Sequence, residues 1–133
     1  MILGLDPGTR KCGYALLEKL GSAPLVLGIA PVAELSARVA ALAAAHPVDI
    51  VALGRGTNSA HVASILTALG LPHALVDERE TTLRARGRFF LDHPPRGWKR
   101  LVPRGMLLPD RPIDDYAALL IAERYLADDR AGR

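Results

Sequence analysis

The chain has 133 residues, half of them hydrophobic and 23 % charged, a balance that excludes a disordered chain and predicts one domain over residues 1–133. A single cysteine excludes an internal disulfide, and the four histidines have no zinc-ligand spacing. No apolar run reaches the roughly 18 residues of a membrane span, and the first residues lack the basic start of a secretory signal. We therefore expect a cytoplasmic protein without a membrane partner, and its net charge of +3 weakly favours a polyanionic one.

The first thirty residues predict three short strands in a row. Apolar runs at 2–6, 13–18 and 25–30 are separated by turn-forming residues, with Asp-Pro-Gly-Thr at the first turn. Because the first connection is short enough for a hairpin, these strands should form an antiparallel three-stranded meander.

Helices then alternate with strands. Helical spacing and capping residues predict helices over 34–45, 62–69, 81–91 and 113–126, and short apolar runs predict strands at 49–54 and 73–78. His46-Pro47 stops the first of these helices and Gly70 the second. This order predicts an α/β fold, a mixed five-stranded sheet with a three-stranded antiparallel meander plus two parallel strands, flanked by helices.

Basic residues are concentrated between positions 84 and 111. They are Arg84, Arg86, Arg88, Arg96, Lys99, Arg100, Arg104 and Arg111, opposed there by Asp92 and Asp110 alone. Such a run is either a solvated face or a phosphate-binding surface. Its density favours the second, since Lys and Arg displace counterions from nucleic acid. Repeated prolines in residues 92–112 predict a long loop, which in a small domain is often functional.

Three acidic side chains stand where predicted elements begin or end. Asp6 ends the first strand, Glu78 ends a later strand, and Asp114 opens the last helix. Each has an ordinary explanation: turn chemistry for Asp6, a solvated charge run for Glu78 and a helix N-cap for Asp114. Their joint placement favours one shared site, because ligands of open α/β sheets collect beyond the carboxyl ends of the strands.

A cluster of carboxylates stays ionised only beside a compensating cation. Oxygen ligands without His or Cys suit Mg²⁺ or Mn²⁺ rather than zinc. Two such ions about 4 Å apart can activate a water and stabilise the leaving oxygen in phosphodiester hydrolysis. The acidic residues therefore indicate a two-metal site.

Three segments, in order along the chain, resemble the motifs of the YqgF/RuvX family. Residues 3–13, LGLDPGTRKCG, resemble its first motif; residues 77–82, DERETT, its middle segment; and residues 113–121, IDDYAALLI, its C-terminal helix. The first motif is shared with RuvC resolvases and, more loosely, with actin-like kinases. The second and third together are specific.

The resemblance implies an RNase H-like fold and a metal-dependent endonuclease for pre-16S rRNA 5′-end processing, Holliday junction resolution, or both. It assigns the catalytic and metal-binding roles to Asp6, Glu78 and Asp114, with Asp114 preferred to Asp115 because it lies three residues before Ala117. The expected nucleic-acid contacts are Thr9, Arg10, Lys11, Arg79, Lys99, Arg100 and Arg104. The partner is then RNA or branched DNA, and symmetric cutting of a junction would call for a homodimer.

Two departures from the family pattern bear on substrate choice. Residues 53–58, LGRGTN, replace the family's Gly-Leu-Pro and Asp-Gly segments. The loop 92–112 is longer than usual and carries Trp98, which either stacks on a base or packs the loop onto the domain. The main alternative function is a non-catalytic nucleic-acid or ribosome-binding module. An actin-like phosphotransferase is disfavoured, because the chain is too short for the two lobes that would close around ATP.

Overall fold

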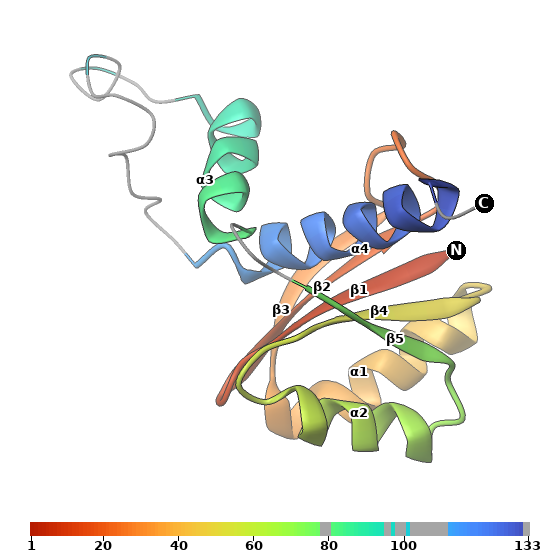
Figure 1. Cartoon of the computed structure of the whole chain (residues 1–133). Coiled ribbons are helices and arrows are strands. Elements are labelled where there is room, and N and C mark those ends of the chain that lie inside the picture. Colours follow the sequence, from red (N-terminus) through yellow and green to blue (C-terminus); the bar gives the residue numbers. More distant parts are fainter. Residues whose placement is uncertain (78–80, 95–96, 98–100, 102–111, 132–133) are drawn as a thin grey trace.

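Five strands form one mixed sheet in the order β3-β2-β1-β4-β5 (Figure 1). In this computed structural model, which describes all residues except 78–80, 95–96, 98–100, 102–111 and 132–133, β1 (Ile2–Pro7), β2 (Lys11–Leu17) and β3 (Val26–Pro31) form an antiparallel meander. β4 (Ile50–Gly54) and β5 (His73–Val76) continue the sheet parallel to β1. The predicted fold class is confirmed.

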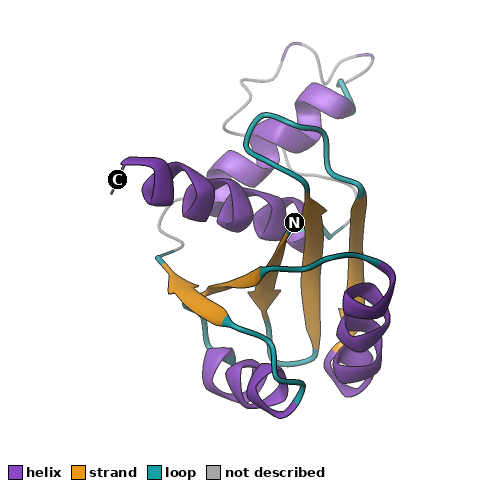
Figure 2. Cartoon of the chain, turned by 90° about the vertical axis from the view of Figure 1, so that its right-hand side faces the viewer, coloured by secondary structure: helices purple, strands orange, loops and turns teal. Residues whose placement is uncertain are grey.

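Helices cover both faces of the sheet (Figures 1 and 2). α1 (Val32–Ala45) and α2 (Ser59–Ala68) lie on one face, and α4 (Asp114–Ala131) crosses the other face with α3 (Thr81–Asp92) packed against it. Most of the predicted loop 92–112, including Trp98, lies outside the described residues. Among the residues that are described, no helix combines the length and apolarity needed to cross a membrane.

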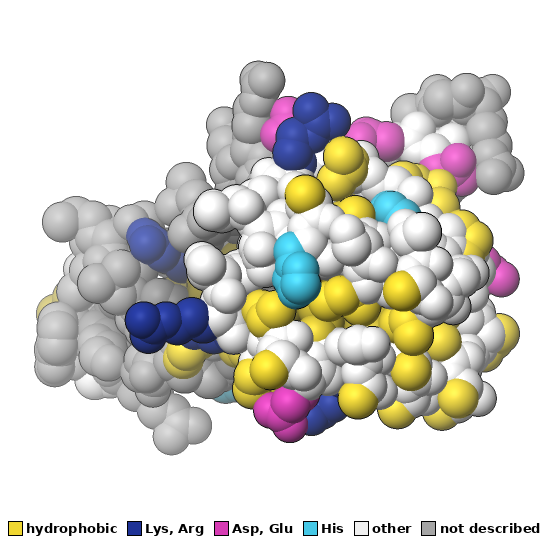
Figure 3. All heavy atoms as spheres, turned by 90° about the horizontal axis from the view of Figure 1, so that it is seen from below, with side chains coloured by type: hydrophobic (Ala, Val, Ile, Leu, Met, Phe, Trp, Pro, Cys, Tyr) yellow, Lys and Arg dark blue, Asp and Glu magenta, His cyan; other side chains and the backbone are white. Residues whose placement is uncertain are grey.

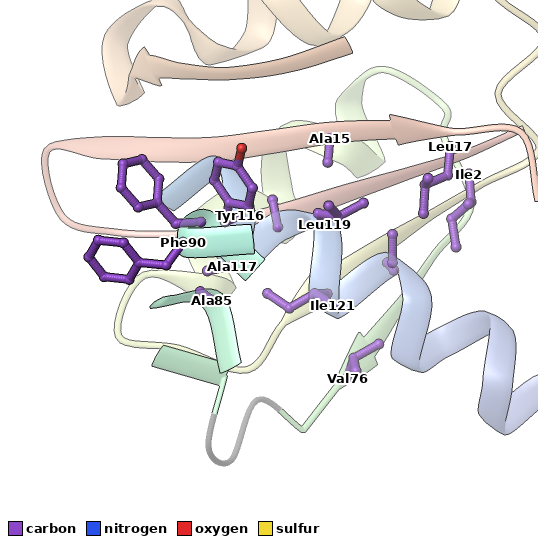
Figure 4. Close-up of a cluster of buried hydrophobic side chains, with 14 residues drawn as sticks. Ile2, Ala15, Leu17, Val76, Ala85, Phe90, Tyr116, Ala117, Leu119 and Ile121 are labelled. Atoms are coloured by element: carbon purple, nitrogen blue, oxygen red, sulfur yellow. The ribbon is translucent and has the colours of Figure 1, made fainter. Parts of the chain in front are cut away.

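Successive side chains of each strand point to opposite faces of the sheet, so the core forms two clusters, one on each side. Toward α1 and α2 the strands supply large aliphatic side chains such as Leu3, Leu5 and Leu53, all fully buried. Toward α4 lies the cluster of Figure 4, in which Phe90, Leu119 and Ile121 come from the helices. Seen from the side of α1 and α2, few charged side chains lie over the middle of the molecule (Figure 3).

Glycines let α4 lie directly against the sheet. A Cβ atom on Gly4 would overlap the carbonyl oxygen of Ala118, and one on Gly13 would overlap the carbonyl oxygen of Asp114. Each strand thus offers only backbone at the point where the helix backbone passes. This close approach fixes the first turn of α4 over β2.

Candidate active site

The acidic residue of the first strand faces α4. Asp6 follows Ile2 and Gly4 on the same side of β1, and it pairs in register with Gly13 of β2. Since the backbone of Asp114 rests on Gly13, residues from the two ends of the chain meet there. The sheet register and the missing side chain at Gly13 bring these two carboxylates to one place.

An open pocket of about 290 Å³ lies at this junction, lined by Asp6, Gly8, Thr9, Arg10, Lys11 and Asp114. All of the predicted catalytic, metal-binding and nucleic-acid-contacting residues that the structure describes line this pocket. The lining combines two carboxylates, one hydroxyl and two cationic side chains, and includes neither histidine nor cysteine. The remaining predicted residues Glu78, Arg79, Lys99, Arg100 and Arg104 lie outside the described residues.

One carboxylate oxygen of the pocket lacks a hydrogen bond. Asp114 Oδ2 is buried, and no donor among the described residues makes a hydrogen bond to it. The Lys11 ammonium lies 3.3 Å away, within ion-pair distance but outside hydrogen-bond geometry. A buried carboxylate oxygen without a donor is costly unless a cation compensates its charge.

The neighbouring Asp115 is not part of the pocket lining. It is buried, with 6 % of its surface exposed, and its Oδ1 accepts a hydrogen bond of 2.9 Å from the backbone N–H of Tyr116. This contact lies within the first turn of α4, where a carboxylate also complements the helix dipole. Of the two adjacent aspartates, the geometry favours Asp114 for a role in the pocket.

The turn that carries the polar side chains is held by a residue from a distant loop. Gly8 donates a backbone hydrogen bond of 3.0 Å to the carbonyl of Lys11, and its own carbonyl accepts one of 2.9 Å from Asn58 Nδ2. Asn58 precedes α2 but makes no side-chain cap there. This role was not predicted, because an Asn before a helix is normally explained as an N-cap.

The pKa of a thiol on the opposite face of the sheet is affected by both carboxylates. Burial, followed by the negative charge of Asp6 and to a smaller extent that of Asp114, raises the pKa of Cys12 from 9.0 to about 12, although a backbone hydrogen bond at Asp6 opposes the shift. Cys12 lies in the cluster under α1, so a metal in the pocket would not use its sulfur. Because both carboxylates raise this one pKa, they are consistent with lying close together.

The start of α4 is also tied to the end of α3. Tyr116 Oη donates a hydrogen bond of 2.8 Å to Asp92 Oδ2, and its ring packs edge-on against Phe89 at 5.7 Å between centroids. Arg88 forms an ion pair of 2.6 Å with Glu123, so this member of the basic run has a structural role. The Tyr116 contacts hold the end of α3 beside the first turn of α4, in which Asp114 lies.

No group of three potential metal ligands occurs within the described residues. The third predicted ligand, Glu78, is not among them. β5 runs parallel to β4, as β4 does to β1, so the carboxyl end of β5 at Val76 lies on the same side of the sheet as the carboxyl end of β1, where Asp6 lies.

The order and pairing of the strands, with helices on both faces, define an RNase H-like fold. No protein-family model matches the sequence, and no curated protein matches it. Two solved structures of RuvC from Thermus thermophilus are similar to it over nearly their whole length. The RuvC in complex with a Holliday junction substrate has a TM-score of 0.64 and 18 % identity over 98 % of this chain and 96 % of that one. A second RuvC structure has a TM-score of 0.60 and 17 % identity with the same coverage.

At these identities the likeness shows the fold. It agrees with the RNase H-like fold that the motifs predicted, whereas the resemblance to the YqgF/RuvX family stays a prediction.

Proposed function

We propose that the chain is a divalent-metal-dependent endonuclease that hydrolyses phosphodiester bonds in nucleic acid, as a single domain over residues 1–133. The observation that carries the proposal is the pocket in which Asp6 and Asp114 meet beside Thr9, Arg10 and Lys11. Carboxylates next to cationic side chains in an open pocket suit a metal on one side and a phosphate backbone on the other.

The residues present fit Mg²⁺ or Mn²⁺. The pocket offers carboxylate oxygens without imidazole or thiolate, and Asp114 Oδ2 is buried without a hydrogen-bond donor in the described structure. Asp6 and Asp114 would hold the metal together with Glu78, which the motifs add. When bound, a pair of such ions supplies an activated water and stabilises the leaving oxygen.

The other side chains of the pocket would bind and orient the substrate. The Thr9 hydroxyl and the cationic groups of Arg10 and Lys11 can contact phosphate oxygens, and all three residues are exposed. From the sequence we add Arg79, Lys99, Arg100 and Arg104 as further backbone contacts. Phosphate contacts of this kind fix the position of the strand and do not read its sequence.

The proposed substrates are branched DNA and precursor rRNA. The likeness to a RuvC bound to a Holliday junction substrate supports branched DNA, and the YqgF/RuvX motifs support pre-16S rRNA 5′-end processing. Resolution of a junction would need a two-fold homodimer that cuts two strands symmetrically. Both substrates are consistent with a cytoplasmic enzyme.

A non-catalytic nucleic-acid or ribosome-binding module is the second candidate. The ion pair between Lys11 and Asp114 favours it, because a cation already lies at the carboxylate that the nuclease would need. The two candidates differ in one respect: only the nuclease requires the carboxylates, whereas a binding module would keep its affinity without them.

A cleavage assay distinguishes these functions. We would incubate the protein, Asp6→Asn and Asp114→Asn with labelled single-stranded RNA, single-stranded DNA and a four-way junction, each with Mg²⁺, Mn²⁺ or a chelator. Asp128→Asn, an exposed aspartate late in α4, is the matched control. We expect metal-dependent cleavage that falls by at least about 100-fold in the two pocket variants and is unchanged in the control.

The preferred substrate decides between rRNA processing and junction resolution. If none of the proteins cuts and all bind nucleic acid equally well, the nuclease proposal is wrong and the binding module is the better account. Cleavage that survives in both pocket variants would mean that the active site lies elsewhere.

A further inference from the structure

We infer that Lys11 is a built-in counter-ion of Asp114, which a divalent cation must displace in order to bind. The inference rests on the metal site of the proposed function and adds a competitor for it within the protein. Its basis is one contact, the 3.3 Å approach of Lys11 Nζ to the buried Oδ2 of Asp114.

The sheet places this lysine where it can reach the carboxylate. Lys11 begins β2 and lies two residues before Gly13, so both face α4. Gly13 has no side chain, and the backbone of Asp114 rests on it. A lysine one pleat away therefore lies beside the first turn of α4, while Arg10 lines the same pocket without forming an ion pair with Asp114.

The contact is suited to exchange rather than to permanent pairing. The side chains of Lys11 and Asp114 are 47 % and 33 % exposed, and an ion pair at that exposure contributes little stability. An ammonium on a flexible stem is also strongly hydrated, so it can leave the contact without being stranded.

A divalent metal bound through the same oxygen would lie closer to it than the ammonium does, since Mg²⁺–oxygen distances are about 2.0–2.1 Å. Two cations so close together repel each other, so metal binding and the lysine contact oppose one another. Lys11 and Arg10 line the same pocket, so a displaced ammonium could pair there with a substrate phosphate.

Manganese binding to the intact chain tests this competition. We would measure Mn²⁺ affinity by the loss of its free EPR signal, without nucleic acid, for the wild type, Lys11→Met, Arg10→Met and Asp114→Asn. We expect Lys11→Met to bind Mn²⁺ about two- to fivefold more tightly, the range set by a partly exposed ion pair. Arg10→Met removes the same charge from the same pocket, so it measures the general electrostatic effect and should change the affinity less.

A second measurement covers the case in which a variant is destabilised. The rise in melting temperature on adding Mn²⁺ should be larger for Lys11→Met than for the wild type, because the variant binds metal more tightly and lacks a counter-ion without it. Equal rises would contradict the inference even if the variant melts at a lower temperature.

The outcomes separate this inference from the proposed function. Equal affinities of Lys11→Met and Arg10→Met, or a weaker Lys11→Met, would overturn the role of Lys11 while leaving a metal site that Asp114→Asn weakens. Absence of Mn²⁺ binding in every protein, or unchanged binding in Asp114→Asn, would overturn the proposed metal site itself.

Discussion

The two faces of the sheet are built in opposite ways. On the face toward α1 and α2, the strands contribute the bulk, with Leu3, Leu5 and Leu16 fully buried. On the face toward α4, the strands contribute glycine and alanine near Asp6, and the helices supply large side chains such as Leu119 and Ile121. The same five strands thus present large side chains toward α1 and α2, which we call the thick face. Toward α4 they present small residues near Asp6, which we call the thin face.

This difference indicates that one face mainly provides stability, whereas the other forms the candidate site. Large side chains between sheet and helix bury more apolar area, at about 25 cal/mol per Å². Small residues forgo part of that area and let backbones approach, which brings Asp114 beside Asp6. Substitutions that change one face at a time test this division.

The largest effect on stability is expected on the thick face. Leu16→Ala removes a fully buried side chain of β2 and should lower the free energy of unfolding by about 2–5 kcal/mol. Mn²⁺ binding by the molecules that remain folded should not change, because Leu16 points away from the pocket. Urea denaturation and the EPR titration measure the two quantities.

Leu25→Ala is the matched control for this prediction. Leu25 is 50 % exposed and its backbone N–H donates to the carbonyl of Leu16, so the same region is changed without opening a cavity. Its cost should stay within about 0.5 kcal/mol. Equal costs for the two variants would show that the thick face is not the main source of stability.

On the thin face, Gly13→Ala should damage the site more than the fold. The added methyl would meet the backbone of Asp114 and Asp115, so α4 must move away from β2. We expect a loss of about 1–3 kcal/mol in unfolding free energy, together with a fall of at least about tenfold in Mn²⁺ affinity. Denaturation and metal titration of the same preparation separate the two losses.

Gly87→Ala provides the opposite case. Gly87 lies within α3, and an added methyl group would find no atom within 4 Å. This substitution should stabilise the protein by about 0.5–1 kcal/mol, the ordinary helix preference for alanine, and leave metal binding unchanged. If Gly13→Ala behaves in the same way, the close approach of α4 is not what forms the pocket.

The sequence predicted the elements well because their periodicity is local. The positions Leu35, Val39 and Leu42 repeat at helical spacing, and α1 buries that stripe. The strand runs were equally clear, and the structure shifts their ends by no more than about two residues, the usual uncertainty at element ends.

Contacts between distant segments could not be predicted from the same patterns. Three acidic residues at element ends suggested one site, but nothing in the local sequence shows that Gly13 receives the backbone of Asp114 or that Asn58 holds the Gly8 carbonyl. The same holds for Lys11, which was expected to bind nucleic acid and lies beside Asp114. Such contacts depend on strand register and on the path of α4, both of which are set by tertiary packing.

A pH-dependent effect connects the two faces through Cys12. Its thiol is buried on the thick face, and burial together with the charge of Asp6 raises its pKa from 9.0 to about 12. Below pH 9 the thiol is protonated in both the folded and the unfolded chain. Above it the unfolded chain loses the proton first, so the free energy of unfolding falls by about 1.4 kcal/mol per pH unit until the folded pKa is reached.

Urea denaturation at pH 8 and pH 10, with a chelator present, measures this slope against that of Cys12→Ala. The wild type should lose about 1.4 kcal/mol more than the variant between the two pH values, since the alanine protein has no thiol to ionise. The fixed cost of removing the sulfur cancels in the comparison of slopes. Equal losses of unfolding free energy in the two proteins would mean that the folded protein does not disfavour the thiolate. In that case the carboxylates of the thin face do not affect the Cys12 thiol on the thick face.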